Sequence, residues 1–311
     1  MFSDVSTAAP CGAYCDLSAL VALRYGARDL DLGRQRKVFS LMVGPHQSRF
    51  RGRGVEFEEV RAYQAGDDIR SIDWRVTART GKPHTKLFRE ERERPVILLI
   101  DQSLSMFFGS RTCCKSVSAA HAAAILAWAA VQHNDRVGGL VFDGRDQAEV
   151  RPRRNVKNVL QLINRIDTFN HRLNRQRDPA LTGIDRALEE LRRITRPGSN
   201  IFLISDFQGL SEAGIKQLHL LRQHNDIAAV RVYDPLEEDL PATGSYTVTD
   251  GAGKLILNAS DRELCRRYQQ NFAEKTTTLE GLLGPMGIPL LPLSTLEEPG
   301  RYFRGLLGRM R

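Results

Sequence analysis

The chain has 311 residues and a formal net charge of +8, from 45 Lys and Arg against 37 Asp and Glu. With 41% hydrophobic and 26% charged residues, it has the composition of an ordinary soluble globular protein. The excess of positive charge permits contact with nucleic acid, an anionic membrane surface or an acidic protein partner, and it selects none of them.

No stretch approaches the roughly 18 consecutive apolar residues that a membrane span requires. The N-terminus has no basic region followed by an apolar one, so it does not resemble a secretory signal. The five cysteines are odd in number, and without an export signal we expect reduced thiols and a cytoplasmic location. Cys11 and Cys15 could lie one helical turn apart, but no second Cys or His pair completes a zinc site with them.

Residues 1–92 form the first predicted region, an N-terminal extension that is mainly β. The apolar spacing from Leu17 to Tyr25 predicts a short helix. Extended segments are predicted over 55–63, 74–80 and 85–88. The segment 64–74 is dense in Asp and Arg, which is typical of a turn with internal hydrogen bonds or of an exposed docking surface.

The strongest strand of the sequence runs from Val96 to Ile100, because five consecutive aliphatic residues suit a strand buried on both faces. Asp101 follows it directly, and Ser103 and Ser105 follow at alternate positions. An acid at this point lies at the edge of the sheet where open α/β folds place their ligands. One carboxylate and two hydroxyls on a tight loop form a partial oxygen shell for a hard cation such as Mg²⁺. A polar turn that caps the next helix is the alternative.

From residue 93 onward, strands and helices alternate, which predicts an α/β domain over 93–300 with a doubly wound, mostly parallel sheet. Further strands are predicted over 137–142, 147–151, 201–204, 227–232 and 289–293, with a hairpin around 246–257. Helices are predicted over 116–132, 156–166, 184–194, 212–223 and 261–282. Residues 301–311 hold four Arg and are expected to form a basic surface tail.

Asp101 and Asp206 are expected to lie side by side. They end the first and fourth strands of the domain, which are neighbours in the common strand order 3-2-1-4-5-6. The loop that opens the third major helix brings Thr182 to the same edge. This convergence of three segments far apart in the sequence favours a ligand site over a simple turn.

The order Asp-x-Ser-x-Ser, then a Thr, then an Asp resembles the metal-ion-dependent adhesion site of von Willebrand factor A-type domains. The resemblance implies a von Willebrand factor A-like, Rossmann-type fold and a bound Mg²⁺ or Mn²⁺. The metal ligands that it implies are Asp101, Ser103, Ser105, Thr182 and Asp206.

Upstream, Gly54-Val55-Glu56-Phe57, Arg61-x-Tyr63 and the stretch from Gly66 to Trp74 resemble the signature of a bacterial family. This is the domain-of-unknown-function family fifty-eight, whose members carry such an A-type domain. The resemblance covers about residue 51 to the end. It implies a protein-interaction module, and it implies partnership with MoxR-type AAA+ ATPases, beside which such members are often encoded.

These resemblances lead to the hypothesis of a non-enzymatic module that binds an acidic residue of a partner through the metal. Neutral hydroxyl ligands leave the ion electrophilic, with a position open for a carboxylate. The alternative is a metal-dependent phosphohydrolase with Asp101 as nucleophile. Haloacid-dehalogenase-like enzymes, however, carry a second Asp where this chain has Ser103, and a Lys that is not found close after the strand 201–204. Nucleic-acid binding rests on charge alone and is not favoured.

Overall fold

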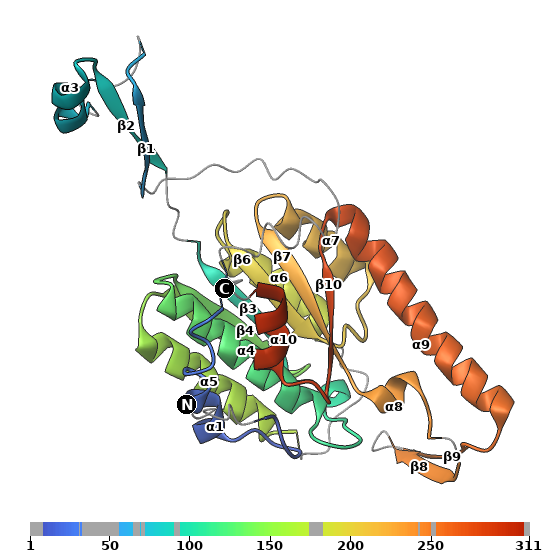
Figure 1. Ribbon diagram of the computed structural model, residues 1–311. Coiled ribbons are helices and arrows are strands. Elements are labelled where there is room, and N and C mark those ends of the chain that lie inside the picture. The colour runs from blue at the N-terminus through green and yellow to red at the C-terminus, as the bar shows by residue number, and fades with distance from the viewer. Residues whose placement is uncertain are drawn as a thin grey trace, which may run out of the picture. The chain divides into compact units, whose positions relative to one another are not determined.

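The computed structural model (Figure 1) describes residues 9–30, 32, 56–64, 69, 72–89, 94–173, 183–241, 243–249 and 253–307. The chain divides into two compact units. One contains residues 1–48 and 95–311, and the other contains residues 49–94. Within the described residues, no helix is both long enough and apolar enough to span a bilayer.

The larger unit is built on a six-stranded sheet that is parallel except at one edge. In spatial order its strands are β10 (Leu290–Ser294), β7 (Asp226–Tyr233), β6 (Asn200–Ser205), β3 (Val96–Asp101), β4 (Val137–Phe142) and β5 (Gln147–Arg153). Strand β5 returns antiparallel to β4, as the predicted hairpin requires. Strands β3 and β6 are parallel neighbours, with Ile100 opposite Ile204. The α/β class, the mostly parallel sheet and this adjacency are therefore confirmed.

Helices cover both faces of the sheet (Figure 1). One face carries α1 (Leu17–Ala22), α4 (Lys115–Gln132), α5 (Val156–Asn170) and α10 (Pro299–Leu307), and the other carries α6 (Ile184–Ile194), α7 (Glu212–Arg222) and the end of α9 (Arg262–Leu283). Strand β3 serves both cores: Leu98 and Ile100 pack with the first group, and Leu99 with the second. All six residues of β3 are buried, as predicted for a central strand.

The N-terminal segment belongs to the larger unit, although the sequence grouped it with the extension 1–92. The side chains of Leu20, Leu23 and Leu30 are buried in the core that α4 and α5 share. The indole Nε1 of Trp128 on α4 donates to the backbone oxygen of Leu20 at 3.1 Å. Burial of these leucines provides the free energy that fixes the segment on the α/β unit, at about 1.5–3 kcal/mol for each side chain.

The smaller unit consists of the antiparallel strands β1 (Glu56–Ala62) and β2 (His84–Arg89) with helix α3 (Trp74–Thr80) between them. The extended conformation predicted for 74–80 is wrong. The carboxylate of Asp73 caps the helix by accepting from the backbone N–H groups of Arg75 and Val76. Gly81 ends it in the left-handed conformation, with φ of 68°.

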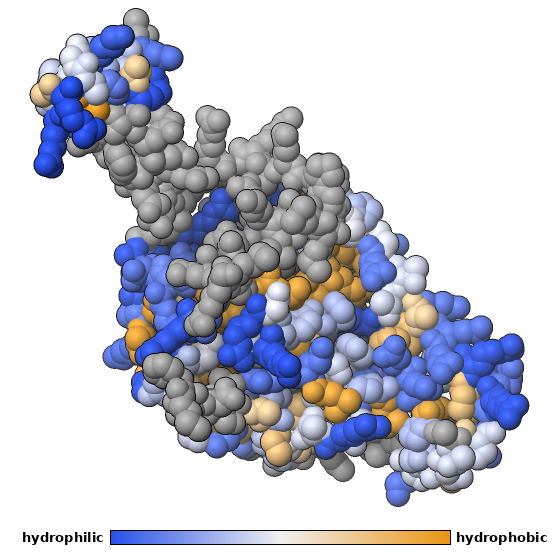
Figure 2. All heavy atoms as spheres, in the orientation of Figure 1, coloured by the Kyte–Doolittle hydropathy of each residue, from blue (hydrophilic) through white to orange (hydrophobic). Residues whose placement is uncertain are grey.

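The C-terminal part completes the larger unit. It contains the short helix α8 (Pro235–Glu238), the predicted hairpin of β8 (Ser245–Thr249) and β9 (Lys254–Asn258), and helix α9. The surface along α9 is largely hydrophilic (Figure 2), and only Leu279 and Leu283 of its 22 residues are buried.

The basic tail expected over 301–311 needs correction. Residues 301–307 lie in helix α10, whose Phe303 and Leu307 are fully buried in the core with α4. The apolar residues between the arginines have the spacing of one helical face, and this face packs in the core with α4. Residues 308–311 lie outside the described residues.

Candidate functional site

Asp101 lies at the carboxyl end of β3, and its carboxylate is held by both neighbouring segments. Its Oδ1 accepts the backbone N–H of Ser103 at 2.8 Å, which closes the turn after the strand. Its Oδ2 accepts from the hydroxyl of Ser205, the last residue of β6, at 2.5 Å. The same hydroxyl accepts the backbone N–H of Phe207 at 2.9 Å. Parallel pairing of β3 with β6 thus brings the two predicted segments together at one edge of the sheet.

The two serines of the loop after β3 lie close to each other. Their hydroxyl oxygens, Oγ of Ser103 and Oγ of Ser105, are 3.1 Å apart, and both side chains are partly accessible. A 3-10 turn over Leu104–Met106 turns both hydroxyls to one side, and the buried Met106 anchors it. The loop presents a pair of neutral oxygen donors next to a buried carboxylate.

Asp206 follows β6 directly and is held by a buried lysine. Its Oδ2 lies 2.8 Å from Nζ of Lys115, the first residue of α4, and its Oδ1 accepts the backbone N–H of Gln208 at 3.0 Å. Phe207 makes this turn possible with a left-handed φ of 59°, a conformation that costs a non-glycine residue about 1 kcal/mol. Strained backbone of this kind is concentrated at functional sites.

Lys115 also contacts a third carboxylate. Its Nζ lies 2.7 Å from Oε1 of Glu237 on α8, and its side chain is only 1% exposed. Burial alone would lower the pKa of Lys115, but the carboxylates of Asp206 and Glu237 raise it, so the amine is a permanent cation. Glu237 is fixed in turn by the capping box of α8, in which its Oε2 accepts the backbone N–H of Asp234.

The electrostatics of this cluster favour an additional cation. Asp206 and Glu237 share the ammonium of Lys115 and also interact with the guanidinium of Arg231. Asp101 adds a third carboxylate beside Asp206, which leaves one net negative charge when all of these groups are ionised. Burial, together with the charge of Asp206, raises the pKa of Asp101 to about 7. A buried carboxylate with a raised pKa beside a second carboxylate is typical of functional sites. A bound cation would offset both the burial and the repulsion.

The oxygen donors fit the dimensions of a magnesium site. Octahedral Mg²⁺ with bonds of about 2.1 Å separates adjacent ligand oxygens by about 3.0 Å. The hydroxyls of Ser103 and Ser105, 3.1 Å apart, have this separation. The donors are all oxygens, which suits a hard cation. Asp206 offers its carboxylate only in competition with Lys115, or by sharing it.

The structure thus brings together four of the five predicted ligands. Asp101, Ser103 and Ser105 share one loop, and Asp206 lies on the adjoining one, where its charge raises the pKa of Asp101. Thr182 lies outside the described residues.

Two contributors were missed at the sequence level. Ser205, directly before Asp206, was given no role from the sequence, and its hydroxyl donates to the carboxylate of Asp101. Lys115 was overlooked because a Lys was sought after the strand that ends at Ser205, whereas it lies on the helix after β3. A signal was present: Lys115 is the one Lys, Arg, Asp or Glu in the Ala-rich stretch 115–132, which suits a buried helix. A cation in the first turn also opposes the helix dipole, so it needs nearby anions.

Comparisons with known proteins identify the family. Residues 59–278 match the family described as Protein of unknown function DUF58. The chain belongs to this family. The match runs from within β1 through most of α9, so this DUF58 chain carries the family's pattern in both of its units and across the cluster around Asp101.

Relatives of this DUF58 protein are found in mycobacteria. It is 29% identical over 270 residues to Uncharacterized protein Rv1480 of Mycobacterium tuberculosis and to Uncharacterized protein Mb1516 of Mycobacterium bovis. Each alignment covers 86% of this chain and 83% of the relative. Among solved structures, a crystal structure of the conserved hypothetical protein BatB from Bacteroides thetaiotaomicron matches with 15% identity and a TM-score of 0.39, over 67% of this chain and 94% of that one.

Proposed function

We propose that this DUF58 protein is a non-enzymatic interaction module that binds an acidic side chain of a partner protein through a divalent cation. The cation, Mg²⁺ or Mn²⁺, is held at Asp101, Ser103, Ser105, Thr182 and Asp206, a set of the von Willebrand factor A type. The observation that carries the proposal is the pair of serine hydroxyls 3.1 Å apart beside the buried carboxylate of Asp101.

The charge balance supports this function. When bound, the ion supplies positive charge and a coordination position that a partner's carboxylate can complete. Ser103 and Ser105 are neutral, so they do not cancel that charge. Asp101 is 2% exposed and bonded to Ser205, so its negative charge acts from inside the protein while the serines face outward. An acidic partner residue is the complementary ligand.

The surroundings of Asp206 offer room for a partner segment. A cavity of about 800 Å³ adjoins Asp206, and its lining combines the cationic Arg231 and Lys275 with the acidic Glu237 and Glu274 and with aromatic rings such as Tyr268. Positive charge next to aromatic surface is a common composition of protein-binding sites. The cavity gives a peptide segment room to dock while its acidic residue reaches the ion.

The partner that we propose is a MoxR-type AAA+ ATPase, as the family resemblance implies. The test is a binding measurement between the purified protein and such an ATPase, with Mg²⁺ or with EDTA. We expect binding only with the metal, and its loss in Ser103→Ala and Asp101→Asn. Ser260→Ala, at an exposed serine far from β3 in sequence, serves as the matched control. Equal binding in EDTA, or full binding by Asp101→Asn, would overturn the proposal.

Lys115 is an observation in favour of a second candidate, a metal-dependent phosphohydrolase with Asp101 as nucleophile. A buried ammonium beside Asp206 is the phosphate-neutralising group that sequence reasoning found missing. Against it, Nζ of Lys115 is already bonded to two carboxylates, and both oxygens of Asp101 accept hydrogen bonds. Hydrolysis of p-nitrophenyl phosphate with Mg²⁺ that is lost in Asp101→Asn and inhibited by vanadate would favour the hydrolase over the interaction module.

A further inference from the structure

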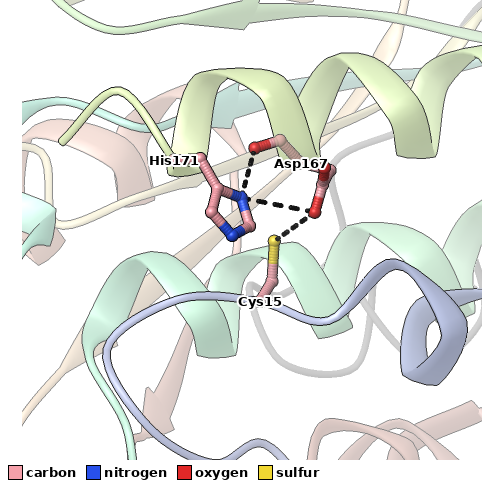
Figure 3. Close-up of side chains that lie close together, drawn as sticks. All are labelled: Cys15, Asp167 and His171. Carbon is pink, nitrogen blue, oxygen red and sulfur yellow. Dashed lines mark hydrogen bonds and ion pairs between the residues drawn. The ribbon is translucent and has the colours of Figure 1, made fainter.

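A second cluster of metal-ligating side chains lies where the N-terminal segment meets the end of α5 (Figure 3). Cys15 comes from the residues just ahead of α1, Asp167 from the last turn of α5, and His171 from its C-terminal cap. Asp167 and His171 are four residues apart, so they share one face of the helix end. Sγ of Cys15, a carboxylate oxygen of Asp167 and a ring nitrogen of His171 all lie within 4.8 Å of one another.

The spacing of these three atoms is that of a tetrahedral zinc site. Zinc bonds of about 2.3 Å to sulfur and about 2.0–2.1 Å to nitrogen and oxygen place tetrahedral S and O ligands about 3.6 Å apart, and N and O ligands about 3.3 Å apart. In the structure, Sγ of Cys15 lies 3.6 Å from Oδ1 of Asp167, and Nδ1 of His171 lies 3.4 Å from the same oxygen. Two of the ligand-to-ligand distances that a tetrahedral zinc site requires, both measured to Oδ1 of Asp167, are therefore already present without the ion.

We propose that Cys15, Asp167 and His171 bind a zinc ion that fastens the N-terminal segment to helix α5. The donor set of one thiolate, one imidazole and one carboxylate suits zinc, whereas Mg²⁺ and Ca²⁺ take oxygen ligands. The fourth position faces solvent, because His171 has a side chain 52% exposed and Asp167 one 24% exposed. Water or an external ligand completes the coordination there.

The backbone around the cluster is held independently of any metal. The N–H of Cys15 donates to Oδ1 of Asn170 at 2.8 Å, and Asn170 is fully buried. The ring of Tyr14 stacks on the ring of His171, with centroids 5.3 Å apart and planes 17° apart. These contacts hold the backbone of Cys15 and the ring of His171 before the ion arrives, which lowers the entropy cost of forming the site.

Binding requires two local changes. Without the metal, Nδ1 of His171 lies 3.0 Å from the backbone oxygen of Asp167, and the Cys15 thiol lies against the Asp167 carboxylate. The metal-bound form needs Nδ1 unprotonated, with the proton on Nε2, and needs the sulfur as thiolate. Zinc binding therefore breaks the hydrogen bond between Nδ1 and the backbone oxygen of Asp167 and releases the thiol proton to solvent, and the zinc bonds to nitrogen and sulfur replace these contacts.

The consequence is control over the docking of the N-terminal segment. Residues 9–30 are held within the larger unit by buried leucines and by hydrogen bonds such as those of Trp128 and Asn170. A zinc ion would add a further link, between Cys15 and Asp167 of α5, which is 152 residues further on. A site absent from the unfolded chain adds its binding free energy to folding.

The test uses the full-length protein, treated with EDTA and dialysed, with zinc content and thermal melting as readouts. We expect one zinc per chain at this cluster and a rise of Tm on adding zinc. Co²⁺ should give the near-ultraviolet charge-transfer band of a cobalt–thiolate bond, because Cys15 supplies sulfur. His171→Gln, at a half-exposed position, should weaken zinc binding by more than the roughly 10–100-fold that loss of an outer hydrogen-bond partner costs.

Matched controls separate this cluster from other metal-binding groups. Cys11→Ser, at an exposed cysteine four residues away, should keep the zinc affinity and the cobalt band, while Cys15→Ser loses both. Asp101→Asn should also keep the zinc affinity and the cobalt band. The result therefore does not depend on whether the cluster around Asp101 binds a metal. Zinc affinity that is unchanged in both Cys15→Ser and His171→Gln, or a cobalt complex without a thiolate band, would overturn the proposal.

Discussion

Asn170 donates its side-chain Nδ2 to Oε1 of Gln102 at 2.8 Å, and both residues are fully buried. Gln102 lies between Asp101 and Ser103, and its Nε2 donates in turn to the backbone oxygen of Ser116 on α4 at 3.0 Å. A chain of buried hydrogen bonds therefore runs from the backbone of Cys15, through Asn170, into the loop that carries the serine pair. Buried polar chains of this kind fix a loop in one conformation, because each unsatisfied member is costly.

Replacing Asn170 tests this connection. Asn170→Leu leaves Oε1 of Gln102 and the N–H of Cys15 without their partner, at about 1–3 kcal/mol for each buried group. We expect a lower free energy of unfolding in urea and weaker Mg²⁺ binding, since the loop after β3 is no longer held. Asn164→Ala, at an exposed Asn on the same helix, should change neither. An unchanged Mg²⁺ affinity in Asn170→Leu would show that the chain of hydrogen bonds does not position the loop.

Lys115 should lower the affinity of the cluster for a metal ion, because its ammonium already pairs with Asp206. In Lys115→Met, the carboxylates of Asp206 and Glu237 lose their counterion, and breaking a buried ion pair costs about 3–5 kcal/mol. The same change removes the cation that competes for Asp206, so we expect Mg²⁺ to bind about tenfold more tightly, equivalent to ~1.4 kcal/mol. The measurement is Tm with and without Mg²⁺, in which the variant melts lower without metal but shows the larger metal-induced rise.

The control for Lys115→Met is Lys157→Met, at an exposed Lys on α5, which should match the wild type in both conditions. A smaller metal-induced rise in Lys115→Met than in wild type would mean that the ammonium assists metal binding instead of competing with it.

Sequence patterns predicted the sheet because its strands are long apolar runs and its helices have clear amphipathic spacing. The neighbourhood of Asp101 and Asp206 followed from the strand order, which places the ends of β3 and β6 together. Helix α3 was missed because the β-branched Val76 and Thr77 favour a strand. Its ends are set instead by the cap at Asp73 and by Gly81, and these two signals were the better guide.

These patterns could not predict contacts between side chains of distant segments. Lys115 and Asp206 are separated by 91 residues, and Cys15 and Asp167 by 152. Local periodicity states which face a residue lies on, but it does not state which side chain from another element meets it. For this reason the zinc partners of Cys15 were sought among Cys and His pairs, whereas the structure supplies a carboxylate and one His from a helix end.

His121 makes the stability of the protein depend on pH below neutrality. It lies in the interior of α4, and burial lowers its pKa from 6.5 to about 4, although the charge of Asp16 acts in the opposite direction. The unfolded chain binds a proton below pH 6.5 and the folded chain does not, so the free energy of unfolding falls as pH drops from 6.5 to about 4. The full loss is roughly 3 kcal/mol.

Urea unfolding between pH 7 and pH 4 measures this contribution. Asp101, whose pKa is raised, takes up its proton over the same pH range and changes the stability in the opposite direction, so the test compares the two proteins. The slope of the free energy of unfolding against pH should be lower in His121→Leu than in wild type by about one proton. Equal slopes in wild type and His121→Leu would show that the imidazole is not the group that titrates.

Asp101 should lower the stability of the metal-free protein, which is the expected signature of a carboxylate placed for binding. Its pKa rises on folding from 3.8 to about 7, because of burial and the charge of Asp206. An acid whose pKa is raised destabilises the fold increasingly as pH rises from the unfolded value to the folded one, and the cost is constant above pH 7. At pH 8 this cost is roughly 4 kcal/mol. Asp101→Asn removes the charge and keeps an oxygen that can accept from Ser103.

We therefore expect Asp101→Asn to be more stable than wild type in EDTA at pH 8, and the gain to shrink towards pH 4. In saturating Mg²⁺ the difference in the free energy of unfolding between the two proteins should shrink or change sign, because only the wild type gains binding free energy. Asp146→Asn, at an exposed aspartate in the β4–β5 turn, controls for the loss of a surface charge. If Asp101→Asn is less stable than wild type in EDTA at pH 8, the hydrogen bonds to Ser103 and Ser205 outweigh the burial of the charge, and Asp101 serves the fold more than a ligand.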